Sequence, residues 1–243
     1  MRGIAMAVTR RLDVFALIET KLRDATELRA IAEAEATRRG IHLRILSCTR
    51  PASFTADGDI NDPSGGILVV VLNPSLAISD IWTDSKGLLS FSAKLPGARR
   101  FACLACYLPD AASPYSRWTD DLIETAATEI RRRRVGHGDL VFWLGDFNLR
   151  LGSDHFGRRV SPDARARATP RVRHLRRALR TLGMLPVHGR AAHIPAVYTS
   201  KHIIPGQPGW SEVDYIIAPV ALPAAMFRPI AAPSWGSDEI LSR

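Results

Sequence analysis

The chain has 243 residues, of which 46% are hydrophobic, so it is long enough to bury a core in one large domain or two small ones. Its 33 lysines and arginines against 24 acidic residues leave a net charge of +9, which favours a polyanionic partner such as nucleic acid, a phosphoinositide or an anionic membrane surface. Three cysteines exclude a disulfide framework, and no apolar run or signal peptide suits membrane insertion or secretion, so we expect an intracellular protein of the nucleus or cytoplasm.

The first predicted strand ends at a carboxylate. Residues 13–18 (DVFALI) are apolar after the first position, and Glu19 follows directly. A carboxylate at the end of a buried strand is costly unless it is paired or bound to a metal ion. Glu19 is therefore a candidate oxygen ligand for a metal ion, and a helix-capping or salt-bridged glutamate is the structural alternative.

A helix and several strands are predicted between Glu19 and residue 107. Asp24 and Glu27 form a capping box at the start of the helix, Gly40 ends it, and its apolar stripe consists of Leu28, Ile31, Ala32 and Ala36. A polar loop is predicted over residues 49–64. Strands are predicted over residues 41–48, 67–72, 88–95 and 100–107.

Two of the three cysteines, Cys103 and Cys106, lie within the last of these strands. Residues three apart in a strand face opposite sides of the sheet. The C-x-x-C spacing therefore indicates core packing rather than a metal or redox site.

The next helix is predicted over residues 116–134, with Ser116 as its N-cap. Four consecutive arginines, residues 131–134, stand at its C-terminus. The helix dipole favours cations there, which accounts for them without a ligand. Contact with DNA is the alternative.

The segment LVFWLGDFNLRL, residues 140–151, is apolar in its first five residues and contains polar residues after them. Its first five residues form an apolar run typical of a strand buried on both faces. Gly145 then permits a turn or a close approach, and Asp146 and Asn148 lie two apart, so an extended backbone points both to one side. One anionic and one neutral oxygen at a strand end can hold a hard divalent cation or orient a water beside it. A strand ending in an Asx turn is the structural alternative.

An arginine-rich region that includes Arg150 leads into another helix, which begins at Thr169-Pro170 as N-cap and first helical residue. Arg173 and Arg177 are among the arginines expected to face away from the core. Both a solvated basic face and contact with phosphates fit this pattern. The residues predicted to face the core are Val172, Leu175, Leu179 and Leu182.

Several segments resemble a known family. The string GDFN after an apolar strand, residues 145–148, resembles the endonuclease/exonuclease/phosphatase superfamily of DNase-like enzymes. The longer string FWLGDFNLR also looks like the first signature of inositol polyphosphate 5-phosphatases, but their second signature is not met. Instead, VYTS at 197–200 and GWSEVDYII at 209–217 resemble the corresponding segment of AP endonucleases and non-LTR retrotransposon endonucleases.

The resemblance implies an α+β fold, a four-layer αββα sandwich, with residues 1–243 forming a single domain. It implies hydrolysis of phosphodiester bonds in DNA by an endonuclease-like enzyme of retroelement type, with Mg²⁺ or Mn²⁺ as the cofactor. Nucleic acid, not a membrane, would be the partner. Arg150, Arg173 and Arg177 would contact its phosphates.

The resemblance also implies roles for individual residues. Glu19, in an E-T-K segment, would be the main metal ligand, and Asp146 would share the metal and orient or deprotonate the attacking water. Asn148 would hold the phosphate or that water. Tyr107 would contact the phosphate, with a packing tyrosine as the alternative, and Asp214 would orient or polarise a catalytic histidine.

The two ends of the chain depart from the family pattern. Ser237 and Asp238 match the last motif, which makes Asp238 a supporting carboxylate near the metal, but Glu239 replaces the catalytic histidine that follows. Eighteen residues precede Glu19, none of them the asparagine of the family's first strand, and four follow Glu239. We therefore expect a domain clipped at both ends, without the first and last strands, and hypothesise a fragment such as a retroelement remnant.

Two other functions fit parts of the sequence. A catalytically inactive, nucleic-acid-binding remnant is favoured by Glu239. A phosphatase of the same superfamily, acting on inositol polyphosphates or lipids, is favoured by FWLGDFNLR and disfavoured by GWSEVDYII.

Overall fold

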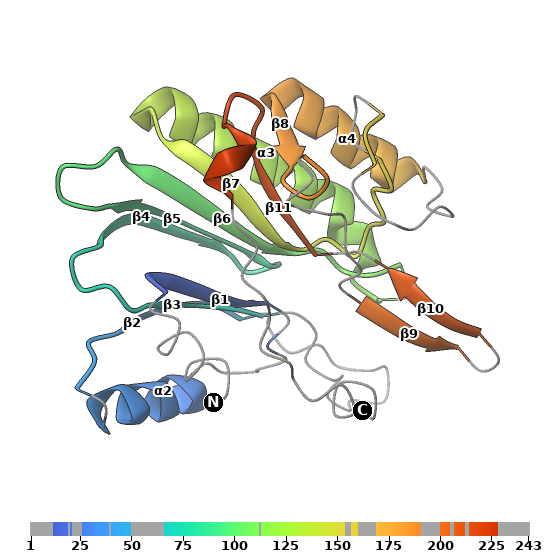
Figure 1. The fold of residues 1–243 in the computed structure, drawn as a ribbon. Coiled ribbons are helices and arrows are strands. Elements are labelled where there is room, and N and C mark those ends of the chain that lie inside the picture. Colours follow the sequence, from blue (N-terminus) through green and yellow to red (C-terminus); the bar gives the residue numbers. More distant parts are fainter. Residues whose placement is uncertain are drawn as a thin grey trace.

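Two sheets face each other with helices on both outer sides (Figure 1). From one side to the other, the layers are helix α2, a three-stranded sheet, a six-stranded sheet, and helices α3 and α4. The predicted αββα sandwich is confirmed. The computed structural model describes residues 12–18, 20, 26–38, 40–49, 66–111, 113–153, 157–159, 169–190, 200–204, 207–211 and 214–227. The predictions of a missing first and last strand, and of the polar loop, concern positions that lie largely outside these residues.

The three-stranded sheet has the order β1-β3-β2, and its pairs are antiparallel. β1 (Val14–Ile18) and β2 (Arg44–Cys48) flank β3 (Ile67–Val71), which is buried along its whole length because both of its faces are covered. α2 (Thr26–Arg38) lies on the outer side of this sheet (Figure 1).

The six-stranded sheet has the order β4-β5-β6-β7-β11-β8. Its central strands are β6 (Phe101–Tyr107), β7 (Leu140–Asp146) and β11 (Asp214–Pro219). β6 and β7 run parallel, and β11 is antiparallel to β7. The other strands are β4 (Ala77–Asp84), β5 (Leu88–Lys94) and β8 (Met184–Pro186). A separate hairpin, β9 (Ser200–Ile204) with β10 (Gln207–Ser211), precedes β11, and a short 3-10 helix, η2 (Ala224–Met226), follows it.

Each face of the six-stranded sheet is covered by a different layer. Along β7, Trp143 packs with α3 (Thr119–His137) and α4 (Pro170–Leu182), whereas the next residue, Leu144, packs toward the three-stranded sheet. Cys106 and Cys103 divide between the same two clusters, so the predicted core packing of the cysteines is confirmed. Burial raises the pKa of the Cys103 thiol to about 12. Among the described helices, none is both long and apolar enough to cross a membrane.

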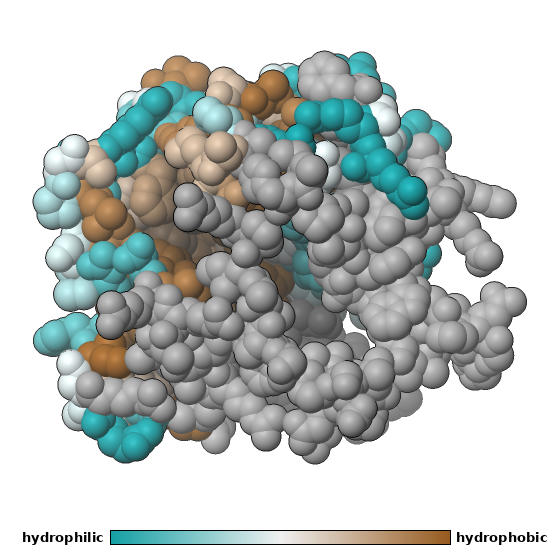
Figure 2. Space-filling view, in the orientation of Figure 1, coloured by the Kyte–Doolittle hydropathy of each residue, from teal (hydrophilic) through white to brown (hydrophobic). Residues whose placement is uncertain are grey.

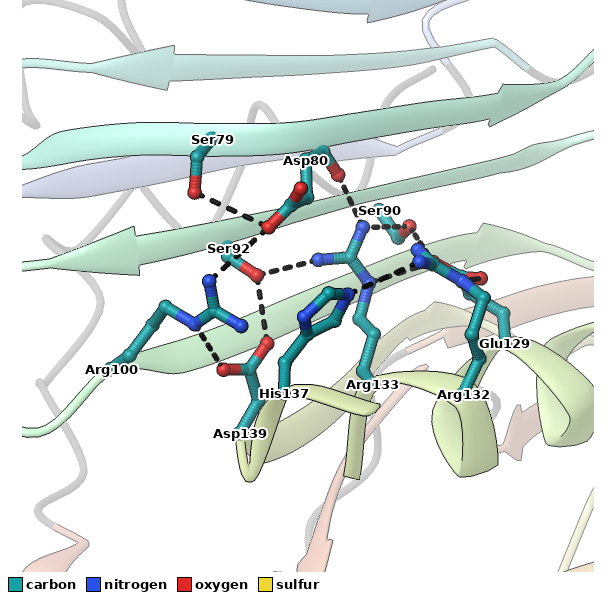
Figure 3. Close-up of polar contacts among 10 residues, drawn as sticks. All are labelled: Ser79, Asp80, Ser90, Ser92, Arg100, Glu129, Arg132, Arg133, His137 and Asp139. Atoms are coloured by element: carbon teal, nitrogen blue, oxygen red, sulfur yellow. Dashed lines mark hydrogen bonds and ion pairs between the residues drawn. The ribbon is translucent and has the colours of Figure 1, made fainter. Parts of the chain in front are cut away.

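A buried ionic network joins α3 to β4 and β5 (Figure 3). Arg133 is fully buried; its Nε donates to Glu129 Oε1 at 2.7 Å, and its terminal nitrogens donate to Ser92 Oγ at 2.7 Å and Ser90 Oγ at 2.9 Å. Ser90 and Arg132 also donate to Glu129, at 2.8 and 2.7 Å. Although burial opposes ionisation, the hydrogen bonds from Arg132, Ser90 and Arg133 lower the pKa of Glu129 to about 2.

The network extends to the end of α3, where Asp139 accepts hydrogen bonds from Ser92 Oγ at 2.8 Å and from Arg100. The explanation of the arginine run by the helix dipole is therefore incomplete. Arg133 is buried in the network, and Arg134 donates to the carbonyl of Leu182 in α4. Sequence alone gives no sign of which of the four arginines faces inward.

Several helix starts and strand limits differ from the sequence predictions. A 3-10 helix, η1 (Ser116–Trp118), precedes α3, so Ser116 does not cap it. β2 begins at Arg44, and Ile31, expected in the buried stripe of α2, is 37% exposed. β4 and β8 were not predicted. β4 lies at the edge of the described sheet, and all of its residues are exposed or half-buried, so its sequence lacks a strong apolar pattern.

α4 agrees with its prediction. Thr169 caps it, because Oγ1 of this residue accepts a hydrogen bond from the backbone N–H of Val172 at 3.3 Å. All four residues predicted to face the core are buried: Val172, Leu175, Leu179 and Leu182.

Candidate functional site

Three predicted site residues lie side by side on the central strands of the large sheet. Tyr107 pairs with Asp146 across β6 and β7, and Asp146 pairs with Asp214 across β7 and β11. Cross-strand partners point to the same face of a sheet. This face carries Leu144 and looks toward the three-stranded sheet, because alternate residues of a strand share a face. Strand pairing thus gathers one phenol and two carboxylates at one end of the sheet.

Gly145 sets how closely β7 approaches β6. Its φ is +150°, and a Cβ added to it would lie 1.9 Å from the carbonyl oxygen of Cys106 on the neighbouring strand. Only glycine avoids this overlap. The predicted close approach is confirmed, and the atoms approached are the backbone of β6. The pairing continues past Gly145, since the N–H of Leu108 donates to the carbonyl of Asp146 at 2.8 Å.

Asn148 is locked against Asp146. Its backbone N–H donates to Asp146 Oδ1 at 2.8 Å, which is the Asx turn considered as the structural alternative. Its side-chain amide donates to the carbonyl of Leu108 at 2.9 Å and to Asp146 Oδ2 at 3.2 Å. Because both acceptors are oxygens, they orient the amide with Nδ2 inward, and Oδ1 is the atom able to accept a hydrogen bond from water. The Asx turn and a functional site therefore coexist.

The segment after Asn148 is anchored from two further elements. Tyr215 of β11 accepts a hydrogen bond from the N–H of Leu151 at 3.0 Å and stacks edge-on against Phe147, with ring centroids 5.7 Å apart. From α4, Arg176 donates to the carbonyl of Leu151 and to Ser153 Oγ. The sequence predicted no role for Tyr215, although it lies one residue after Asp214. Its position in the string VDYII was the available signal.

The site concentrates negative charge. Asp146 is 8% exposed, and directly opposed residues of antiparallel strands have Cα atoms about 4.5–5.5 Å apart. Burial raises the pKa of the Cys106 thiol, and the charges of Asp146 and Asp214 raise it further. Both carboxylates therefore lie near the same thiol. Two adjacent carboxylates attract a cation, and Mg²⁺ prefers oxygen ligands.

The donor set at this end of the sheet therefore fits a divalent metal ion, with Asp146 and Asp214 as its carboxylates. Within the described ranges, no group of three or more His, Cys, Asp or Glu residues is arranged to hold a metal. Glu19, the predicted main ligand, lies outside those ranges, as do Asp238 and Glu239.

The remaining predicted residues lie in different surroundings. Tyr107 is 4% exposed, so its packing role is present whatever else it contacts. Arg150 is exposed and follows the locked turn directly. Arg173 and Arg177 are exposed on α4, which covers the opposite face of the large sheet from Asp146. The structure therefore does not bring these two arginines together with the carboxylates on one face.

A sequence model of the Endonuclease/Exonuclease/phosphatase family matches residues 4–238. The chain belongs to this family. The match includes every residue predicted at the site, and the resemblance of GDFN to this family is confirmed. Members of the endonuclease/exonuclease/phosphatase family are phosphoester hydrolases. Comparison with curated proteins gave no match.

Solved structures share the fold of this family member. An AP endonuclease from Archaeoglobus fulgidus is 18% identical, with a TM-score of 0.57 over 88% of this chain and 79% of that one. The 3′ phosphatase NExo from Neisseria, bound to product DNA hairpin, is 18% identical, with a TM-score of 0.55 over 92% and 84%. A mannosyl-6-phosphatase from Bacteroides thetaiotaomicron is 11% identical, with a TM-score of 0.56 over 90% and 75%. At these identities the likeness establishes the fold and leaves the substrate open.

Proposed function

We propose that the chain is a divalent-metal-dependent phosphodiester hydrolase that acts on DNA as an endonuclease. The observation that carries this proposal is the pair of carboxylates, Asp146 and Asp214, in register beside the turn locked by Asn148. The segment GWSEVDYII supports the nuclease branch of the family, including its retrotransposon members, over the 5-phosphatases.

In this proposal Asp146 orients the attacking water and accepts its proton. Asn148 accepts a second hydrogen bond from that water through Oδ1, since its amide N–H groups are directed at Leu108 and Asp146. Tyr107 borders the position of the phosphate, and Arg150 contacts a flanking phosphate. Mg²⁺ or Mn²⁺ held by Asp146 and Glu19 would offset charge that develops on the phosphate, with Asp214 and Asp238 as supporting carboxylates.

The test is nicking of supercoiled plasmid, with and without an abasic site, in Mg²⁺ or Mn²⁺. The wild-type chain should nick, and Asp146→Ala should reduce the rate by about 10²-fold or more, because the proton acceptor is lost. Asp120→Ala, which removes an exposed carboxylate from the first turn of α3, is the matched control and should leave the rate unchanged. Equal rates for wild type and Asp146→Ala would refute the proposed role of Asp146.

Glu239 favours a second candidate, a nucleic-acid-binding chain without turnover, because a glutamate cannot donate the positively charged hydrogen bond of the histidine it replaces. An inert wild type that gains nicking through Glu239→His would identify a nuclease scaffold disarmed at one position. Release of phosphate from an inositol polyphosphate without nicking would replace both candidates by a phosphatase.

A further inference from the structure

The outer surface of α4 is strongly cationic. The helix contains five arginines and one histidine and no acidic residue. Arg173, Arg177 and Arg180 are exposed along one side of it. The surface over α4, at the upper right of Figure 2, is coloured largely as hydrophilic. None of these three side chains belongs to the carboxylate site on the other face of the sheet.

Two contacts align α3 with α4. Near the start of both helices, His174 Nε2 lies 2.8 Å from Glu124 Oε1, and near their ends Arg134 donates to the carbonyl of Leu182. The helices therefore run parallel. Arg131 is exposed on α3, one turn before the Arg134 that contacts the end of α4. We call Arg131, Arg173, Arg177 and Arg180 the arginine face.

The arginine face gives α4 little net stabilisation, because of its residues on this helix only Arg180 lies in the last turn, where the dipole favours a cation. Arg173 lies in the first turn of α4, where the dipole disfavours a cation by about 0.3–1 kcal/mol. Arg177 follows Arg173 by four residues and precedes Arg180 by three, and each such like-charged pair costs about 0.2–0.5 kcal/mol. Within the described part of the chain, Arg131, Arg177 and Arg180 make no ion pair. Binding of a polyanion would relieve this repulsion.

The exposed residues of the arginine face fit nucleic acid better than a membrane surface as the binding partner. A helix that lies on a membrane exposes an apolar side beside its basic one. The apolar residues of α4 are instead buried in the core, and its outward positions hold arginine and threonine. From Arg173 to Arg180 the helix rises about 10 Å, whereas a DNA duplex carries one negative charge per roughly 1.7 Å of its axis. Several phosphates can therefore face this stretch together.

We propose that the arginine face is a second, non-catalytic nucleic-acid-binding surface, which contacts backbone phosphates on the side of the large sheet opposite Asp146. It rests on the proposed function only in naming DNA as the partner, since binding there requires no hydrolysis. Contacts of this kind hold DNA without regard to base sequence and weaken with salt.

The test is fluorescence anisotropy of a labelled 30-base-pair duplex in EDTA, titrated over a range of salt concentrations. The variant is the triple Arg131→Gln, Arg177→Gln, Arg180→Gln. The matched control removes three exposed cations elsewhere: Arg29→Gln, Lys94→Gln, Arg117→Gln. Loss of three phosphate contacts should make the slope of log affinity against log salt less negative by about 3 and weaken binding roughly tenfold or more at 0.1 M salt. The control should keep the wild-type slope.

Equal losses in the two triple variants would show a general charge effect and overturn the proposal, as would an unchanged slope in the variant. Binding to phosphatidylcholine vesicles containing phosphatidylserine is measured in parallel. Loss of vesicle binding with intact DNA binding would assign the face to a membrane instead. A wild type that never nicks plasmid, yet shows the slope change, would keep this inference and reject the proposed hydrolase.

Discussion

Asp146 of β7 and Asp214 of β11 are direct partners in the register of two antiparallel strands. Like charges in this arrangement repel unless a cation or hydrogen-bond donor lies near them. The pair is not needed to hold the strands together, because the ladder between β7 and β11 continues through apolar residues toward Trp143 and Ile217. Because the pair lies at the strand ends, we interpret it as a cation-binding feature rather than as part of the packed core.

Asp214→Asn should weaken metal activation more than it weakens the fold. Removing one of the two adjacent charges should raise the Mg²⁺ concentration for half-maximal nicking by roughly 10–100-fold. A Mg²⁺ titration of plasmid nicking measures the shift. Asp120→Asn is the surface control, and an unchanged midpoint in Asp214→Asn would exclude this residue from the metal environment.

Asn148 combines a backbone and a side-chain role that two substitutions separate. Its φ is +46°, which an alanine adopts at a cost of about 1 kcal/mol and a glycine adopts freely. Asn148→Ala and Asn148→Gly should both lose nicking activity, by roughly 10–100-fold, because both lack the amide that locks Asp146. Both variants should lose stability in urea unfolding, because both lack the amide hydrogen bonds to Leu108 and Asp146, and the φ of +46° adds a further loss for Asn148→Ala alone. Near-normal activity in Asn148→Gly would mean that the turn geometry alone is required.

Gly145→Ala should separate β6 from β7. The added Cβ meets backbone atoms of Cys106, which cannot move aside as a flexible side chain would. We expect a loss of roughly 2–4 kcal/mol in the free energy of unfolding, measured by urea denaturation. Gly136→Ala, at a glycine with open space around its Cβ position, is the control and should be near neutral. A loss as small as the control's would show that the strands tolerate a wider spacing.

Glu129→Gln should be strongly destabilising. The substitution leaves the buried guanidinium of Arg133 without its carboxylate, and breaking a buried pair costs about 3–5 kcal/mol. Arg131→Gln, on the exposed side of the same helix, should change the free energy of unfolding by less than about 0.5 kcal/mol. Equal effects in urea denaturation would show that the network contributes no more than surface charges.

The same network predicts an acid dependence of stability. The pKa of Glu129 is lowered from its ordinary 4.5 to about 2 in the folded chain. Because the folded state has the lower pKa, the stabilisation is fully present above about pH 4.5 and is lost as pH falls toward 2. The difference in unfolding free energy between wild type and Glu129→Gln should therefore shrink between pH 5 and pH 3. A constant difference would contradict this assignment.

Residues with strong local signals were predictable from sequence. The apolar run of β7 ends in the predicted polar turn, and Thr169 caps α4, because an apolar period and a capping side chain act over a few residues. Asp146 and Asn148 stood out for the same reason. Tyr215 and Arg176 were not predicted from sequence, since both anchor the site through hydrogen bonds with Leu151, which lies on a different segment of the chain.

The family, the layered fold and the candidate polar residues were predictable without coordinates, because motifs and hydrophobic periods are local properties of the chain. The shared face of Tyr107, Asp146 and Asp214 emerges from the folded sheet, since it depends on the register of strands far apart in sequence. The fold also selects which arginine of the run at 131–134 is buried. That choice follows from Ser90 and Ser92, which meet α3 only when β5 packs beneath it.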